Sequence, residues 1–177
     1  SAFPELGTVN MNEAAENAVR AYLPLRWSEA VVAAARETGV DPWLIAGIAR
    51  QESGFAAHAM SPRGAIGVLQ LLPSTARLHG RALGLGSQPD LRDPEINLRL
   101  GARELSSLMR RFGAVETALA AYNGGLTRAR GWWKKWPDRR RFTEEIPVPE
   151  TYNYVRRVVF LAEAYRQVYE EEWRRTQ

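Results

Sequence analysis

Apolar residues recur along most of this chain at intervals of three or four, the spacing that places side chains on one face of an α-helix. Near the end of the chain, Val155, Val158, Ala162, Tyr165 and Tyr169 follow this rule, with arginines and glutamates between them. Alternation of apolar and polar residues, which predicts strands, is almost absent, and no hairpin dipeptide separates two alternating runs. The pattern therefore predicts an all-α fold of about eight helices.

Proline and glycine mark most of the expected helix ends. Asp41-Pro42 combines a capping carboxylate with proline at the first helical position, and Pro73, Pro94 and Pro149 also open helices. The expected helices cover residues 13–22, 28–38, 42–53, 73–83, 94–112, 115–122, 126–135 and the chain from 149 onward, with a short helical turn at 65–70. Residues 54–64, 84–94 and 136–148 are expected to be irregular, so loops separate the helices that could carry a site.

The size and hydrophobic content fit one domain. The chain has 177 residues, 45% of them hydrophobic, and no apolar run approaches the 18 or so residues that a membrane span needs. We expect residues 27–177 to form the domain, with Ser28 capping its first helix. Residues 1–26 are expected to be a lead-in segment that packs on the domain or connects it to another part of a longer protein.

Composition excludes several kinds of chemistry. The chain has no cysteine, which rules out disulfides, thiolate catalysis and Cys-based zinc sites. It has two histidines, His58 and His79, without an HExxH pair, and it contains neither a GxSxG elbow nor a phosphate-binding GxxxxGK[ST] loop. The net charge of +4 and a pI of about 9.7 suit an anionic polymer as partner, although an ordinary basic protein would look the same.

Glu52 is the residue that the pattern singles out for chemistry. It continues the apolar stripe of Ile45, Ile48 and Ala49 at the end of a helix, and Ser53-Gly54 break the helix directly after it. A carboxylate at the inner end of an apolar face is poorly hydrated, so its pKa rises. Raising the pKa of a glutamate from about 4.3 to about 6.5 costs roughly 3 kcal/mol, which a purely structural residue would seldom retain. We therefore predict that Glu52 is a general acid.

The stretch at residues 52–70, ESGFAAHAMSPRGAIGVLQ, is rich in small and polar residues. Gly67 permits a positive φ or a close approach of the backbone to another group. Ser53 and Ser61 can hydrogen-bond the preceding carboxyl, and Gln70 offers an amide to a sugar hydroxyl or acetamido group. A glycine-rich loop with an incidental glutamate is the alternative interpretation.

Two later pairs of polar residues could face the same site. Tyr122 and Asn123 end a short apolar helix before a pair of glycines, and Glu150 and Tyr154 lie four residues apart on one face of the last helix. Each pair also has a structural interpretation, because a buried tyrosine, a capping asparagine and a glutamate at a helix start all occur without function.

Taken together, these segments resemble the catalytic domain of the soluble lytic transglycosylases, in the lysozyme-like superfamily. That family carries a Glu-Ser pair and then an SPxGAxGLMQ stretch, matched here by Glu52-Ser53 and by SPRGAIGVLQ at residues 61–70. Its AYN segment is matched at residues 121–123, and its late IPxxETxxYV segment at residues 146–155, IPVPETYNYV. Order and spacing agree over roughly residues 28–170, and four ordered motifs are far more specific than any one of them.

The resemblance implies a lysozyme-like domain with a cleft that cleaves the β-1,4 bond between N-acetylmuramic acid and N-acetylglucosamine in peptidoglycan. Glu52 would protonate the leaving oxygen and then accept the proton of the muramoyl 6-hydroxyl, which gives a 1,6-anhydro sugar without consuming water. Hydrolytic glycosidases use two carboxylates, and Glu150 could lie close in space. A peptidoglycan hydrolase of the goose-type lysozyme kind and a non-catalytic wall-binding protein are therefore the alternatives.

The resemblance also implies the remaining features of the site. Besides the catalytic Glu52, the expected substrate-binding residues are Ser53, Ser61, Gly67, Leu69, Gln70, Tyr122, Asn123, Glu150 and Tyr154. The chain departs from the family at Val68-Leu69, where Leu-Met is usual, but this exchange keeps the position apolar. We expect no metal, no cofactor, glycan strands of peptidoglycan as partner, no nucleic acid, a monomer, and a periplasmic or cell-envelope location after export.

Residues 128–142, RARGWWKKWPDRRRF, contain seven Arg or Lys and three Trp. They could form a surface that binds the wall, with tryptophans stacked on sugars and cations facing the carboxylates of peptide stems. They could also bind nucleic acid through phosphates and bases. A third interpretation is that the tryptophans belong to the core and the cations only solvate the surface. The resemblance favours the wall over nucleic acid.

Overall fold

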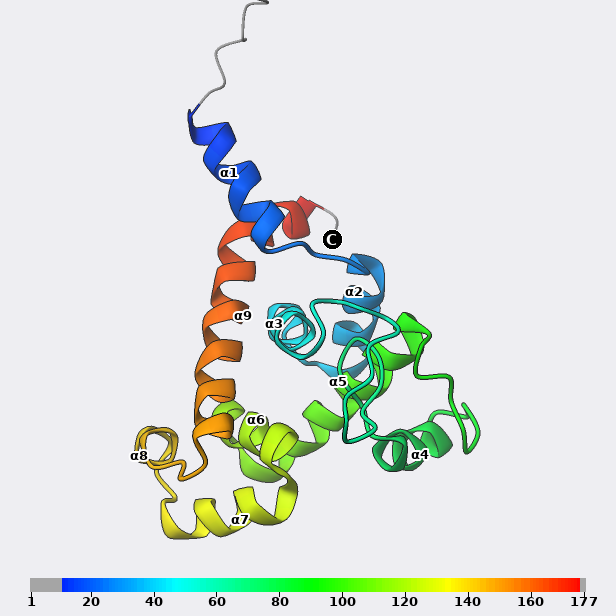
Figure 1. Ribbon diagram of the computed structural model, residues 1–177, viewed down its shortest axis with the longest axis vertical. Helices are drawn as coiled ribbons and strands as arrows, with labels where there is room; N and C mark the ends of the chain where they lie inside the picture. Colours follow the sequence, from blue (N-terminus) through cyan, green and yellow to red (C-terminus); the bar gives the residue numbers. More distant parts are fainter. Residues whose placement is uncertain (1–10, 176–177) are drawn as a thin grey trace, which may run out of the picture.

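The computed structural model describes residues 11–175, which contain nine α-helices and no strand (Figure 1). The helices are α1 (Met11–Tyr22), α2 (Ser28–Thr38), α3 (Pro42–Glu52), α4 (Pro73–Ala82), α5 (Pro94–Phe112), α6 (Val115–Gly124), α7 (Leu126–Lys135), α8 (Arg139–Glu144) and α9 (Pro149–Arg175). The all-α prediction is confirmed, and the helix count in this part of the chain exceeds the predicted number by one.

Two of the predicted helix starts have the expected chemistry. The Asp41 carboxylate accepts a hydrogen bond of 3.0 Å from the backbone N–H of Trp43, and proline follows at the first helical position. Asp93 accepts bonds of 2.8 and 3.1 Å from the N–H groups of Glu95 and Ile96. These side chains satisfy amides that a helix leaves without an internal partner, which fixes where α3 and α5 begin.

Three local predictions are wrong. The helix α8 lies in a segment expected to be irregular, where Asp138 caps it and Phe142 is buried. Ser28 is the first residue of α2 rather than its cap, and Trp27 holds the cap position with a φ of 57° and no side-chain cap bond. The turn at residues 65–70 is not helical, because positive φ values at Gly67 and Gln70 are incompatible with a right-handed helix.

Helix α3 lies at the centre of the core. Every residue from Trp43 to Ala49 is buried, and α3 packs most extensively against α9 and also against α2. In Figure 1, α3 is seen end-on between α9 and the α2–α5 pair. A Cβ atom on Gly47 would lie 3.0 Å from the carbonyl oxygen of Val158 and from the backbone nitrogen of Ala162, so the backbones of α3 and α9 touch directly. This contact sets the position of the end of α3 against α9.

The described part of the lead-in segment contacts α9. The hydroxyl groups of Tyr165 and Tyr169 donate hydrogen bonds of 3.1 and 2.8 Å to the carbonyl oxygens of Pro24 and Leu23. Arg20 of α1 forms an ion pair with Glu172. Residues 1–10 of this segment lie outside the described residues, and the domain boundary after residue 26 stays a prediction. None of the helices between residues 11 and 175 combines the length and apolar character that crossing a bilayer requires.

Candidate active site

Glu52 is the last residue of α3, at the end of the most deeply buried helix. Burial raises the pKa of its carboxyl from 4.5 to about 7, the Tyr154 hydroxyl lowers it by a smaller amount, and the negative charge of Glu150 raises it further. Removal from water disfavours the charged form, which is the effect expected for a carboxyl that continues an apolar stripe. Glu52 is therefore substantially protonated at neutral pH.

Two tyrosines from different helices lie close to this carboxyl. Tyr154 of α9 is 4% exposed, and its hydroxyl makes no hydrogen bond of standard geometry with any described residue, although it interacts with Glu52 closely enough to change the glutamate's pKa. Tyr122 of α6 donates a hydrogen bond of 2.9 Å to the carbonyl oxygen of Leu69. Burial and then the charge of Glu52 raise the pKa of both phenols. The three side chains thus form one electrostatic group.

The loop after α3 is held by Asn97, a residue that the sequence analysis missed. Its side chain is fully buried and accepts a hydrogen bond of 2.7 Å from the N–H of Leu69. It also donates bonds of 2.9 Å to the carbonyl oxygens of Ile66 and Leu91. One amide therefore joins three segments of backbone. A polar residue between Ile96 and Leu100 on the inner face of α5 was the available signal.

Gly67 is needed where it lies, for two reasons. Its φ is 82°, and a Cβ atom there would lie 2.2 Å from the carbonyl oxygen of Leu91 and 2.3 Å from Nδ2 of Asn97. The prediction that this glycine allows a close backbone approach is confirmed, but the group it approaches is the protein's own. Leu69 is 2% exposed and its side chain lies against Gly101 of α5, so this residue contributes to the site through its backbone.

The predicted polar residues of the loop bond mainly to the loop itself. The Ser53 hydroxyl donates a 2.8 Å bond to the carbonyl oxygen of Val68, and the Ser61 hydroxyl accepts a 3.0 Å bond from the N–H of Ala65. Neither hydroxyl forms a hydrogen bond with the Glu52 carboxyl, which was the expected role of one of them. Both stabilise the loop that borders this carboxyl.

Gln70 has the same structural role, with a φ of 48° and its side-chain NH₂ bonded to the carbonyl oxygens of Ala59 and Gly67 at 3.2 and 2.9 Å. The amide nitrogen is therefore occupied within the loop. The side-chain oxygen of Gln70 is the part of this amide that a ligand could bind.

The end of α6 and the start of α9 are joined beside this group. The Thr151 hydroxyl donates a 2.8 Å bond to the side-chain oxygen of Asn123, and a Cβ atom on Gly124 would lie 3.0 Å from that hydroxyl. Glu150, one residue before Thr151, is exposed but near enough to Glu52 to raise its pKa. The structure thus brings together Glu52 of α3, Tyr122 of α6, and Glu150 and Tyr154 of α9. Asn123 lies where α6 meets the start of α9.

A second polar contact that the sequence analysis missed joins His79 to Glu104, whose charge acts on Tyr122. Nε2 of His79 is 2.5 Å from a carboxylate oxygen of Glu104, which joins α4 to α5. The charge of Glu104 contributes to the raised pKa of Tyr122. The His79 side chain is therefore buried and paired with Glu104.

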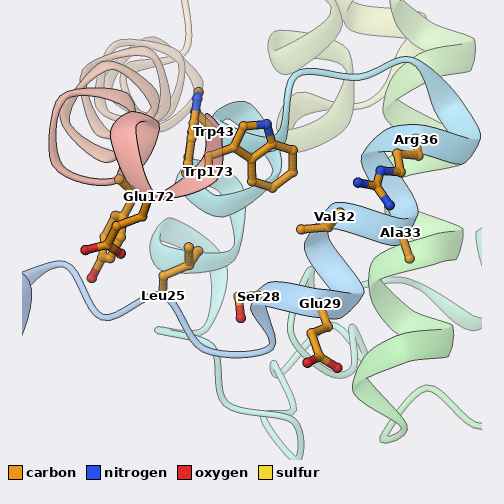
Figure 2. A pocket seen from close by; sticks show the side chains of 10 residues that line it. Leu25, Ser28, Glu29, Val32, Ala33, Arg36, Trp43, Glu172 and Trp173 are labelled. Carbon is orange, nitrogen blue, oxygen red and sulfur yellow. The ribbon is translucent and has the colours of Figure 1, made fainter. Parts of the chain in front are cut away.

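A hollow of about 520 Å³ lies at the opposite end of α3 (Figure 2). Trp43, near the start of α3, and Trp173, near the end of α9, border it together with Leu25 and Val32. Glu52 is nine residues from Trp43, which corresponds to about 13 Å along the helix axis. The hollow is mainly apolar and lies away from Glu52, the carboxyl whose pKa is raised. We therefore look for the active site at the other end of α3.

Sequence comparison places this arrangement among known proteins. Residues 29–143 match the family model described as "Transglycosylase SLT domain". The chain is 38% identical over 105 residues to the transglycosylase of Enterobacteria phage PRD1, an alignment that covers 59% of this chain and 37% of the phage protein. It is 36% identical over 126 residues to the soluble lytic murein transglycosylase of Escherichia coli K12, covering 67% of this chain and 20% of that protein.

Structure comparison agrees with the sequence matches. An inactive mutant of the lytic transglycosylase Slt from Pseudomonas aeruginosa superimposes with a TM-score of 0.77 and 36% sequence identity. The superposition covers 84% of this chain and 25% of that protein. The chain thus spans between a fifth and two fifths of the length of these relatives. Residues 149–175, which supply Tyr154 and Glu150, lie beyond the residues matched by the family model.

Proposed function

Because this chain belongs to the transglycosylase SLT domain family, we propose that it is a peptidoglycan lytic transglycosylase. The bond cleaved is the β-1,4 linkage between N-acetylmuramic acid and N-acetylglucosamine, and the product carries 1,6-anhydro-N-acetylmuramic acid. The observation that carries the proposal is Glu52, a carboxyl with a pKa of about 7 beside the buried Tyr154 and the partly buried Tyr122. A carboxyl with this pKa can donate a proton near neutral pH and accept one afterwards.

In the first step, the neutral Glu52 gives its proton to the glycosidic oxygen as the bond from that oxygen to C1 of the muramic residue breaks. The carboxylate that results then accepts the proton of the 6-hydroxyl of the same residue, whose oxygen forms the new bond to C1. Glu52 is neutral again at the end, and no water is consumed. Positive charge at C1 between the two steps is stabilised by the substrate's own acetamido group.

Tyr154 and burial act in opposite directions on the pKa of the Glu52 carboxyl. The Tyr154 hydroxyl favours the carboxylate, whereas burial favours the acid, and together they keep the pKa near 7. We place the sugar strand along the face beside Glu52, where Tyr122 and Asn123 end α6 and Glu150 begins α9. The loop held by Asn97 forms the other border of this face, with the side-chain oxygen of Gln70 available to a sugar.

Hydrolysis is the second candidate, because Glu150 is near enough to Glu52 to raise its pKa. In hydrolytic glycosidases a second carboxylate activates water or attacks C1. We favour the anhydro route because Glu150 is exposed at the start of α9, where a carboxylate is also favoured by the helix dipole.

Digestion of purified sacculi followed by mass spectrometry of the released muropeptides separates these candidates. The proposal expects products one water lighter than the hydrolytic ones, released by the unaltered protein and not by Glu52→Gln. Products of hydrolytic mass would assign the reaction to a peptidoglycan hydrolase. An absence of release in both samples, with retained binding, would indicate a wall-binding protein. The proposed substrate also places the protein in the cell envelope, where glycan strands are found.

A further inference from the structure

The helix α7 has a strongly two-sided surface. At about 100° per residue, its inner side carries Leu126, Ala129, Trp132 and Trp133, all packed on the core. Its outer side carries four exposed cations within an arc of about 160°. We name these four the α7 basic face: Arg128, Arg130, Lys134 and Lys135. Trp132 and Trp133 are partly buried against the core, whereas the four cations are exposed, so the cations are the larger part of what this helix presents outward.

The excess positive charge of this protein is concentrated on the α7 basic face and on α8. Residues 128–141 hold seven Arg or Lys and one Asp, so the rest of the chain holds 17 Arg or Lys against 19 Asp or Glu. Among the described residues, Arg139 pairs with Glu116 and Arg140 with Glu144, whereas Arg128, Arg130 and Lys134 have no ion-pair partner. An unneutralised cluster of this density attracts anions over a distance of about 10 Å at moderate salt.

The α7 basic face starts next to the proposed active site. Only Gly125 separates the end of α6, which carries Tyr122 and Asn123, from the start of α7. A Cβ atom on Gly124 would lie 3.4 Å from ring carbon Cη2 of Trp132, so the inner side of α7 rests on the same junction. In Figure 1, α7 and α8 form the end of the molecule opposite α1.

We propose that the α7 basic face binds the carboxylates of the peptide stems that hang from the glycan strand in the active site. This inference rests on the proposed function, because it takes peptidoglycan as the substrate. An extended stem of four or five residues reaches about 15 Å, comparable to the roughly 10 Å width of one helix. Stems of a strand lying against Tyr122 and Asn123 can therefore contact the outer side of α7.

The test measures binding apart from cleavage. All proteins carry Glu52→Gln, and each is pelleted with sacculi or with the same sacculi after their carboxyl groups have been converted to neutral amides. The test variant is Arg128→Gln/Arg130→Gln/Lys134→Gln. The control is Arg26→Gln/Arg111→Gln/Arg175→Gln, which removes the same charge from three exposed arginines on other elements that have no ion-pair partner among residues 11–175.

We expect the test variant to bind untreated sacculi about tenfold more weakly than the parent, the scale of three exposed ion pairs, and the control to bind as the parent does. Amidated sacculi should bind parent and test variant equally. Equal binding of untreated sacculi by parent and test variant would overturn the inference. So would a loss of affinity for duplex DNA or for phosphatidylglycerol vesicles while affinity for sacculi is unchanged. The binding test uses Glu52→Gln proteins, whereas the cleavage test uses proteins with Glu52 intact. If the α7 basic face does not bind stems, the anhydro product can still be detected. If the proposed reaction is wrong, binding to sacculi can still be measured.

Discussion

At the scale of single residues, Glu52 differs from an ordinary glutamate because its neighbours act on its charge in opposite directions. Burial and Glu150 raise its pKa to about 7, and Tyr154 lowers it. The proposed reaction requires the acid form, so kcat/KM on sacculi should fall as pH rises through about 7. Replacement by Gln should reduce the rate on the order of 10²–10⁴-fold, the usual contribution of a general acid.

The two neighbours give a paired prediction for the pH profile. Tyr154→Phe removes the hydroxyl that lowers the pKa of Glu52, so the descending limb of kcat/KM should move to higher pH. Glu150→Gln removes the charge that raises this pKa, so the limb should move to lower pH. The measurement is kcat/KM on sacculi across pH, which reports the free protein. Shifts in the same direction would contradict the electrostatic account of the site.

The raised pKa also predicts a cost in stability. Between pH 4.5 and 7 the folded protein keeps a proton on Glu52 that the unfolded chain has lost, so the free energy of unfolding decreases as pH rises through this window. The decrease is at most about 3 kcal/mol. Glu52→Gln cannot lose a proton, so it should be more stable than the parent at pH 8 and similar at pH 4 in urea unfolding. The exposed Glu171→Gln is the control, and a gain for Glu52→Gln that is equal at both pH values would refute the linkage.

At the scale of elements, local signals predict helices well and loops poorly. The starts of α3 and α5 follow from an aspartate and a proline that act within three residues of each other. The loop at residues 66–71 depends instead on Asn97, whose amide acts across 28 residues of sequence. A local sequence pattern does not reveal a hydrogen bond between residues so far apart in the chain. The pattern therefore predicted a helical turn at residues 65–70, where the structure has a loop with positive φ at Gly67 and Gln70.

The same reasoning explains which parts of the site were predictable. Glu52 was found because it continues an apolar stripe, and Tyr154 because it lies one helical turn from Glu150. The partners of Ser53 and Gln70 are backbone carbonyl groups of a folded loop, which no residue pattern reveals. Glu104 and His79 were missed because their importance lies in being buried together.

Gly64 and Gly67, which both lie between α3 and α4, give a matched test. At Gly67 an added Cβ would collide with Asn97 and the Leu91 carbonyl, so Gly67→Ala should lose about 3 kcal/mol or more of unfolding free energy by disrupting the Asn97 bonds. Gly64 has a similar φ of 78° but open space around it, so Gly64→Ala should lose only about 1–2 kcal/mol. Urea unfolding measures both, and equal losses would show that φ alone matters.

At the scale of the whole molecule, the helices of the described residues and the superposition on a solved lytic transglycosylase confirm the lysozyme-like, all-α fold, with α3 at its centre. The direct backbone contact at Gly47 fixes α3 against α9 and hence Glu52 against Tyr154. A methyl group there has backbone atoms 3.0 Å away on α9. Gly47→Ala should therefore lower the free energy of unfolding by about 1–3 kcal/mol and also lower kcat.

The control for this substitution is a helical glycine without neighbours. Gly131 in α7 has nothing within 4 Å of an added Cβ. Gly131→Ala should raise stability by about 0.5–1 kcal/mol, because alanine restricts the unfolded chain more than glycine does. Thermal unfolding and turnover on sacculi check both variants. A Gly47→Ala protein as stable and active as the parent would mean that α9 can move away without consequence.

The touching backbones of α3 and α9 also limit how this protein can respond to a substrate. Sliding one helix past the other would drive main-chain atoms into each other at Gly47, and no side chain there can rotate to make room. The acid and its tyrosine are consequently pre-set before any ligand arrives. The opposite border, the loop held by Asn97, is tied through one buried amide to three backbone segments. Both borders of the candidate site are therefore fixed before a ligand binds, and a ligand that fits must already match their spacing.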